Sequence, residues 1–341
     1  MKPLLHPTPV NGPFEDPVLY VDFLYGRRAL LFDLGSLRAL APRKILRVAD
    51  VFVTHTHMDH FQDFDWLLRL FLGRDKRVRL YGPSGFLDRV EHRLQGYTWN
   101  VVRNYDTDLT FVVTEMESAE TGRRAEFHLQ RAFARENETE VSLPGGVLRD
   151  EPAIRVQAAV LDHGIPCLGF AVEEKIHVNI WKTRIEELGL STGRWLRDLR
   201  QAVLRGDPDD TVIRAWWREG GETRERFLPL GELKREALQI VPGQKIGYVV
   251  DVRDTEENRE AIARLVQGAD LFFVETAFLD ADADQAERKQ HLTARQAGTL
   301  AARAGVKAVV PLHFSPRYEG REEELREEAS AAFRRARSAD S

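Results

Sequence analysis

Three histidines and an aspartate fall within six consecutive positions of the sequence, in the segment HTHMDH. These residues are His55, His57, Asp59 and His60, and they begin just after an apolar run, Val51 to Val53. Neutral imidazoles and carboxylates are the usual ligands of a divalent ion that keeps one position open for water. In an extended turn His55 and His57 can point toward one ion, while Asp59 and His60 can face a second. The pattern predicts a metal centre that activates water.

Three further polar residues stand where other apolar runs stop. His163 follows AIRVQAAVLD, Asp251 follows KIGYVV, and His313 follows VKAVVPL. In layered α/β proteins, ligand sites lie at the ends of strands. Taken alone, each residue is typical of an ordinary turn, which is the alternative interpretation. Taken with the HTHMDH segment, the recurrence favours one shared site.

The elements that must position these residues alternate along the chain. Short apolar runs predict strands, and segments with apolar residues three and four positions apart predict helices between or after them. Such alternation is typical of a layered α/β architecture, which we expect as a single domain over residues 1–341. The expected strands are 18–24, 29–34, 49–54, 78–81, 153–159, 245–250, 270–275 and 308–312, and the expected helices are 65–72, 254–267, 293–304 and 322–337.

Residues 175–245 differ from the rest of the chain. Four tryptophans, Trp181, Trp195, Trp216 and Trp217, stand there among many arginines. The pattern predicts either a helical insertion whose aromatic side chains pack into the core or a protruding element that binds a partner. Basic residues only slightly outnumber acidic ones, so the segment would attract RNA weakly. A dimer contact anchored by the tryptophans is an equal alternative.

The composition limits the class of protein and the kind of metal site. A chain of 341 residues with 43% hydrophobic and 30% charged residues is typical of a globular enzyme. The single cysteine, Cys167, excludes an internal disulfide and a zinc site of several thiolates, so a metal must use His, Asp or Glu. The net charge of -5 offers nucleic acid no global attraction. Without a membrane-length apolar segment or a secretory signal, we expect a cytoplasmic protein with no membrane partner.

Several motifs together resemble one known family. HTHMDH, LDHGIPCLGFAVEE, GYVVDVRDT, VETAF, QHLTA and HFSPRY occur in an order similar to that of metallo-β-lactamase-fold hydrolases, and specifically ribonuclease Z, over residues 18–320. The resemblance implies an αββα sandwich (the metallo-β-lactamase fold) with residues 175–245 as an inserted arm. It also implies two metal ions: one held by His55, His57 and His163, the other by Asp59, His60 and His313, with Asp251 between them.

The implied chemistry is hydrolysis of a phosphodiester. Two Zn²⁺ ions would lower the pKa of a shared water and polarise the phosphate for in-line attack by metal-bound hydroxide. Mn²⁺ or Fe²⁺ would suit the same ligands. By resemblance, His291 supplies a proton to the leaving oxygen, Glu275 orients it, and Asp59 is also assigned to catalysis. The alternative for His291 is a structural residue at the start of a helix.

Candidate substrate contacts lie close to these catalytic candidates. They are Ser315 and Arg317 of HFSPRY and Thr293 of QHLTA. Arginine suits paired donation to a phosphate. As structural alternatives, Arg317 pairs with a carboxylate of the acidic C-terminal segment, and Thr293 caps the following helix.

The resemblance implies endonucleolytic cleavage at the 3′ end of a tRNA precursor, with RNA as partner and a homodimer as a candidate assembly. The sequence departs from the family at the N-terminus, which lacks a glycine-rich strand turn, and in the arm, which lacks a Gly-Pro-rich signature. Val274 and Leu292 also replace a usual His and Ser. These departures motivate an alternative, a hydrolase of a small phosphodiester or another ester. A non-catalytic metal-binding protein is the third hypothesis.

Overall fold

The computed structural model describes residues 3–24 and 26–339, and the chain divides into two compact units. The larger unit comprises residues 5–149, 156–172 and 245 onward. The smaller unit consists mainly of residues 173–244, the segment that the sequence singled out as an arm. No helix within the described residues is long and apolar enough to cross a membrane.

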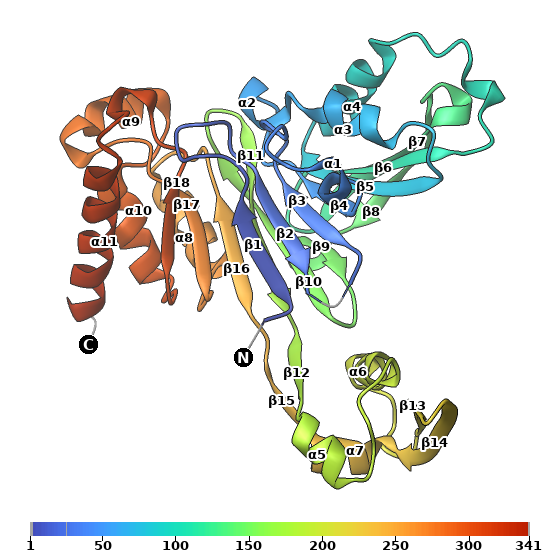
Figure 1. Ribbon diagram of the computed structural model, residues 1–341. Helices are drawn as coiled ribbons and strands as arrows, with labels where there is room; N and C mark the ends of the chain where they lie inside the picture. Colours follow the sequence, from blue (N-terminus) through green and yellow to red (C-terminus); the bar gives the residue numbers. More distant parts are fainter. Residues whose placement is uncertain (1–2, 25, 340–341) are drawn as a thin grey trace. The chain divides into compact units, whose positions relative to one another are not determined.

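One sheet of the larger unit has eight strands that follow one another in chain order (Figure 1). Its four central strands, β3 to β6, are parallel, and the pairs toward both edges are antiparallel. The strands are β1 (Leu5–Pro9), β2 (Leu19–Phe23), β3 (Ala29–Phe32), β4 (Val48–Phe52), β5 (Lys76–Pro83), β6 (Leu109–Met116), β7 (Thr121–His128) and β8 (Arg135–Ser142).

The second sheet has six strands in the order β18-β17-β16-β11-β10-β9. Because β16, β17 and β18 are parallel, their carboxyl ends lie at the same edge, and this brings Asp251, Glu275 and His313 together. The strands are β9 (Val147–Asp150), β10 (Ile154–Asp162), β11 (Pro166–Glu174), β16 (Lys245–Val249), β17 (Leu271–Glu275) and β18 (Val309–Leu312).

Helices cover the outer faces of the two sheets, which gives the expected αββα sandwich. Helices α3 and α4 pack on the first sheet, and α8 and α10 pack on the second, with α11 against α10. The helices are α1 (Pro42–Ile45), α2 (Met58–Phe61), α3 (Phe64–Phe71), α4 (Phe86–Gln95), α8 (Glu256–Leu265), α9 (Ala283–Lys289), α10 (Ala294–Arg303) and α11 (Glu322–Ala339). Single 3₁₀ turns are η1 (Val102–Asn104), η2 (Leu129–Arg131), η3 (Pro144–Gly146), η4 (Asp280–Asp282) and η5 (Pro316–Tyr318).

Strand β4 shows how the sequence builds the two layers beside the site. Val51 and Val53 pack in the core beneath α3 and α4, whereas Phe52 points to the opposite face. There its ring lies 5.0 Å from that of Phe32 and 5.6 Å from that of Phe170 on β11. Alternate side chains of a strand face opposite sides of the sheet, so an unbroken apolar run is what a strand buried on both faces requires.

The smaller unit is a mixed α/β structure, so the prediction of a helical insertion is wrong for much of it. It has two antiparallel strand pairs, β12 with β15 and β13 with β14. The turn between β13 and β14 is Gly220-Gly221, with φ of 59° and 89°, and such a Gly-Gly pair is a hairpin signal that the helical reading overlooked. The elements are β12 (Ile176–Ile180), α5 (Lys182–Glu187), α6 (Trp195–Arg205), β13 (Val212–Glu219), β14 (Glu222–Pro229), α7 (Leu230–Ala237) and β15 (Leu238–Pro242).

The tryptophans of this unit have different surroundings. Trp195 is fully buried in the unit's core and donates its indole N–H to the carbonyl oxygen of Ser191 at 2.9 Å. Trp216 and Trp217 lie on β13 and pack against the same core, while Trp181 is 47% exposed. Packing into a core is therefore confirmed for Trp195, and the core belongs to the smaller unit itself.

Candidate metal centre

The HTHMDH segment leaves β4 and turns into the short helix α2. His55 and His60 are completely buried, and His57 is the exposed N-cap residue of α2. The ring centroids of His55 and His57 are 4.4 Å apart, and those of His55 and His60 are 4.2 Å apart. The turn thus gathers its three imidazoles into one cluster.

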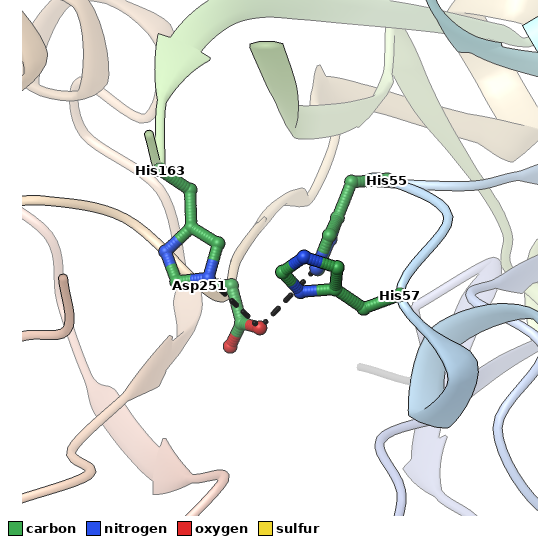
Figure 2. A group of neighbouring side chains, drawn as sticks. All are labelled: His55, His57, His163 and Asp251. Carbon is green, nitrogen blue, oxygen red and sulfur yellow. Dashed lines mark ion pairs between the residues drawn. The ribbon is translucent and has the colours of Figure 1, made fainter. Parts of the chain in front are cut away.

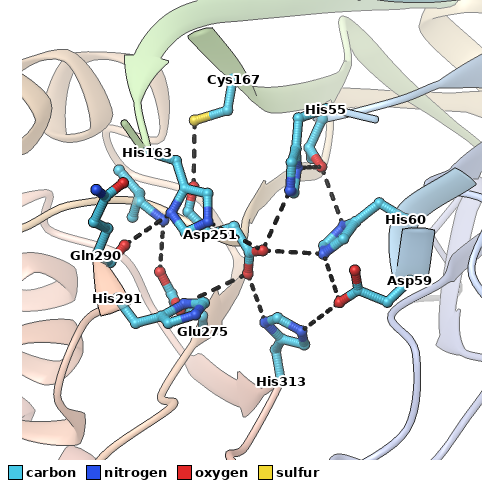
Figure 3. Close-up of polar contacts among 12 residues, drawn as sticks. His55, Asp59, His60, His163, Cys167, Asp251, Glu275, Gln290, His291 and His313 are labelled. Carbon is cyan, nitrogen blue, oxygen red and sulfur yellow. Dashed lines mark hydrogen bonds and ion pairs between the residues drawn. The ribbon is translucent and has the colours of Figure 1, made fainter. Parts of the chain in front are cut away.

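Asp251 joins this turn to the second sheet. Its Oδ2 atom lies 3.4 Å from His55 Nε2, 3.2 Å from His60 Nε2 and 3.6 Å from His163 Nε2. Its Oδ1 atom lies 2.7 Å from Nδ1 of His313 (Figure 3). One carboxylate therefore faces four imidazoles that come from three distant parts of the chain.

The seven residues that the sequence singled out as ligands form two groups, which share Asp251. Figure 2 shows the first group, in which three histidines surround the carboxylate. Within each group the ligand atoms all lie within 4.8 Å of one another. The first group is His55, His57, His163 and Asp251, and the second is Asp59, His60, Asp251 and His313.

Two nitrogen atoms of the cluster test whether a cation fits. Nε2 of His55 and Nε2 of His60 are buried, and neither has a hydrogen-bond partner among the described residues. A buried polar atom without such a partner is costly unless another group compensates it. A divalent cation in each ligand group would do so, one beside each nitrogen, and the donor set of imidazole and carboxylate suits such ions.

Backbone strain accompanies the cluster. Asp251 and His313 have positive φ angles of 53° and 55°, and Asp33, beside them, has 59°. Residues other than glycine seldom adopt this left-handed conformation, and it persists where the surroundings impose it, often at functional sites. In this case it occurs within two residues of the ends of β3, β16 and β18, at residues whose side chains belong to the cluster.

The charges in the cluster depend on one another. Burial would raise the pKa of Asp251, but His313 and His60 hold the pKa well below its ordinary value. Burial would lower the pKa of His313, but Asp251 and Asp59 raise the pKa to about 10. The pKa of His60 is also raised, against burial, by Asp251 and Asp33. Without an ion, protonated imidazoles neutralise the carboxylates.

Asp33 supports the cluster from behind, and the sequence analysis missed it. It is fully buried, and its Oδ2 atom lies 3.0 Å from Nδ1 of His60. Tyr248 donates its hydroxyl to Oδ2 at 2.9 Å, and the backbone N–H of Thr54 donates to Oδ1 at 2.7 Å. A carboxylate bound to the second ring nitrogen orients a metal-ligating histidine. Asp33 follows the apolar run of LLFDLG, and a polar residue just after such a run is the same signal that identified His163, Asp251 and His313.

His291 and Glu275 form a separate pair at the edge of the cluster. Nδ1 of His291 lies 2.8 Å from Oε2 of the fully buried Glu275, whose Oε1 accepts the N–H of Val252 at 2.7 Å. Burial would lower the pKa of His291, but Glu275 raises it. With Asp251 and His313 these two residues form a third group with ligand spacing. Because both Glu275 oxygens already accept hydrogen bonds, this group is less suited to an ion than the other two.

A cavity of about 380 Å³ opens over these residues. Ser315 lines it, and so does Lys289, which the sequence analysis missed. Arg317 is not part of the lining, and its guanidinium lies 3.3 Å from Asp282, so its partner is not the acidic C-terminal segment. Thr293 is fully buried and caps α10, as its structural alternative predicted. A substrate in the cavity could not reach its side chain.

Solved structures resemble this chain in fold. The short form of human tRNase Z has 19% sequence identity and a TM-score of 0.50, with 94% of both chains covered. The metallo-β-lactamase fold protein YhfI from Bacillus subtilis has 16% identity and a TM-score of 0.55, with 97% of this chain and 94% of that chain covered. These likenesses place the chain in the class of metallo-β-lactamase-fold proteins, and its site adds two groups of residues with the spacing of metal ligands.

Curated relatives narrow this class to one family, although no protein-family model matches the chain. Ribonuclease Z from Deinococcus radiodurans is 33% identical over 346 aligned positions, which cover 99% of this chain and 98% of that protein. Ribonuclease Z from Bacillus velezensis is 28% identical, with 90% and 85% covered. The chain belongs to the ribonuclease Z family.

Proposed function

We propose that this protein is a dinuclear zinc phosphodiesterase that cuts tRNA precursors endonucleolytically at the 3′ end. Family membership supports the substrate class, since the aligned relatives are ribonucleases Z over almost the whole chain. The observation that carries the chemistry is that two groups of metal ligands share Asp251. One carboxylate between two such groups is an arrangement that can hold a pair of cations close together.

In this proposal each ion has its own histidines. His55, His57 and His163 would hold one ion, Asp59, His60 and His313 would hold the other, and Asp251 would bind both. Two bound Zn²⁺ ions would supply positive charge for the phosphate oxygens and lower the pKa of a water molecule.

The remaining chemistry belongs to side chains of the protein. Glu275 binds Nδ1 of His291, which leaves Nε2 of this ring free to give a proton to the departing oxygen of the ribose. Asp59 stays ionised, because the neighbouring His313 and His60 lower its pKa in spite of burial, and its charge therefore suits the binding of a cation. Ser315 and Lys289 line the cavity, where they can contact the phosphate.

Two of the departures from the family do not touch this cavity. Val274 and Leu292 are buried in the core between the second sheet and its helices, at 0% and 2% exposure. Neither side chain lines the cavity. Their replacement by apolar residues therefore fits core packing and leaves the proposed reaction as it is.

The test uses the purified protein loaded with zinc and a tRNA precursor that carries a 3′ trailer. We expect a single cut at the junction, and end-group analysis of both products identifies which oxygen departs. Asp251→Asn, which weakens both ligand groups at once, should abolish the cut. Cleavage that survives this substitution, or that is absent with every divalent ion, would contradict the proposal.

A small phosphodiester is a second candidate substrate. The 380 Å³ volume of the cavity lies within the range of pockets for small ligands, about 300–1,000 Å³. The two candidates differ in salt dependence, because only a polyanion should bind more weakly as salt rises. Turnover of cyclic or bis(p-nitrophenyl) diesters without any RNA cleavage would favour this candidate.

The proposal also covers the setting of the enzyme. Processing of newly made RNA would place it in the cytoplasm. A homodimer and an RNA-binding role for residues 175–245, most of which lie in the smaller unit, complete the proposal. Light scattering of the purified chain tests the dimer, and its molar mass should be about twice the 39.0 kDa of one chain.

A further inference from the structure

A second cavity adjoins the metal centre. It has a volume of about 640 Å³, and residues of α2 and α4 form its walls. His57 lines both this cavity and the one over the metal ligands. A substrate that continues past the reacting phosphate can therefore extend from one cavity into the other.

Helix α4 presents unopposed positive charge to this second cavity. Arg89 is exposed, and within the described residues its side chain makes no ion pair or hydrogen bond; the same holds for His92, one helical turn further on. The acidic residues of the helix do not pair with Arg89, because Asp88 and Glu91 both lie 2.5 Å from the guanidinium of Arg135. Arg89 is thus a cation available to an anionic ligand.

Arg93 gives this cavity a fixed wall. Its guanidinium donates to the carbonyl oxygens of Phe61 at 3.1 Å and Gln62 at 2.8 Å, and it lies 3.5 Å from Asp65. These contacts tie α4 to the end of α2. Arg93 therefore acts in the structure of the wall, and Arg89 is the arginine left for a ligand.

The opposite wall offers apolar surface. Met58 follows His57 at the start of α2, is 80% exposed and lines the cavity together with Phe61. An apolar surface beside an unpaired arginine matches a nucleotide, because the base can pack against the apolar surface and the phosphate can contact the arginine. The cavity's volume lies within the range of pockets for small ligands, which suits one or a few unpaired nucleotides.

We infer that this cavity, which we call the Arg89 pocket, binds the unpaired nucleotides of the 3′ trailer, with Arg89 on a phosphate and Met58 against a base. The inference rests on the proposed function and specifies which part of the RNA the protein holds beside the metal centre. The trailer is favoured because its nucleotides are unpaired and can be splayed onto protein side chains, whereas the acceptor stem of a tRNA is a double helix. A second copy of this chain is the competing occupant.

The test compares Arg89→Ala with Arg335→Ala. Arg335 lies on α11, is also exposed and makes no ion pair among the described residues, so it is a matched control. Three substrates are used: a tRNA precursor with a long trailer, the same precursor with a trailer of a single nucleotide, and bis(p-nitrophenyl) phosphate. We expect R89A to lower kcat/KM about tenfold on the long trailer only, and to reduce the salt dependence by about one phosphate contact.

The outcomes separate this inference from the proposed function. Suppose that the wild-type protein cleaves both precursors. The Arg89 pocket is then overturned, and the proposed function stands, if R89A shows no defect, if R89A is equally defective on both precursors, or if R335A shows the same defect as R89A. A wild-type chain that hydrolyses the small diester and no RNA overturns both. Met58→Glu should weaken long-trailer cleavage at unchanged molar mass. A change in molar mass by light scattering would assign the pocket to a second copy instead.

Discussion

His291 and Glu275 form a buried ion pair at the edge of the metal cluster, with 2.8 Å between Nδ1 and Oε2. Glu275 has no exposed surface, whereas the side chain of His291 is 18% exposed and lines the cavity. The pair therefore has a fixed partner on one side and an accessible ring on the other. This geometry supports the proposed role of His291 as a proton donor.

The ion pair predicts a pH effect for Glu275→Gln. Burial acts to lower the pKa of His291, and Glu275 raises it above the ordinary 6.5. As a proton donor His291 works in its charged form, so activity on RNA should fall as pH rises through this raised pKa. Without the Glu275 charge the alkaline fall should begin about one pH unit lower or more. Profiles of kcat against pH measure this shift, and Glu260→Gln on the exposed face of α8 should leave the profile unchanged.

The role of His291 predicts a substrate-dependent loss in His291→Ala. A ribose oxygen leaves poorly without a proton, so RNA cleavage should fall about a hundredfold or more. The p-nitrophenolate of bis(p-nitrophenyl) phosphate leaves without one, so its hydrolysis should fall far less. His128→Ala, at the distant pair with Asp108, is the control. An equal loss on both substrates would instead mean that His291 holds a metal ion or the local structure.

Asp33→Asn should weaken metal binding although Asp33 is not among the ligands. The carboxylate holds Nδ1 of His60 at 3.0 Å, and loss of such a partner costs roughly 10- to 100-fold in metal affinity. Competition with a chelator measures the affinity. Tyr248→Phe, which removes only the hydroxyl that donates to Asp33, should have a smaller effect. Equal affinities in all three proteins would rule out a supporting role for this carboxylate.

Metal uptake should release protons and tighten as pH rises. In the free chain the pKa of His313 is about 10 and that of His60 is also raised, so both carry protons at neutral pH. A cation must displace these protons, and its apparent affinity therefore grows with pH. Calorimetric zinc titrations in buffers of different ionisation enthalpy count the protons released. An affinity that is flat between pH 6.5 and 8.5 would contradict this picture of the cluster.

Trp195→Ala should destabilise the smaller unit and spare the metal centre. Trp195 is fully buried there, and truncation of a buried tryptophan costs about 3–5 kcal/mol. Hydrogen exchange should rise across residues 176–242, and hydrolysis of bis(p-nitrophenyl) phosphate should persist. Trp181→Ala, at a position that is 47% exposed, should have a much smaller effect. Loss of small-diester activity in W195A would show that the two units are coupled.

The strands predicted from apolar runs are all present, with ends that shift by a few residues, and the four predicted helices are present too. Strands β8 and β6 are among those that were not predicted, and their burial differs. Strand β8 (RENETEVS) is largely exposed, so it lacks the apolar alternation on which such a prediction depends. Strand β6 (LTFVVTEM) is wholly buried and carries an apolar run like those of the predicted strands. The same rule applied to this segment would have predicted a strand.

By itself the sequence determined the local chemistry, because side chains two or three positions apart, as in HTHMDH, must stay close in any turn. It also marked His163, Asp251 and His313 as strand-end residues. Only the tertiary structure decided that Asp251 stands between two groups of histidines, that Asp33 supports His60, and that Arg89 lies beside His57. These relations join residues far apart in the chain, and they depend on strand order, register and backbone angles that no local pattern encodes.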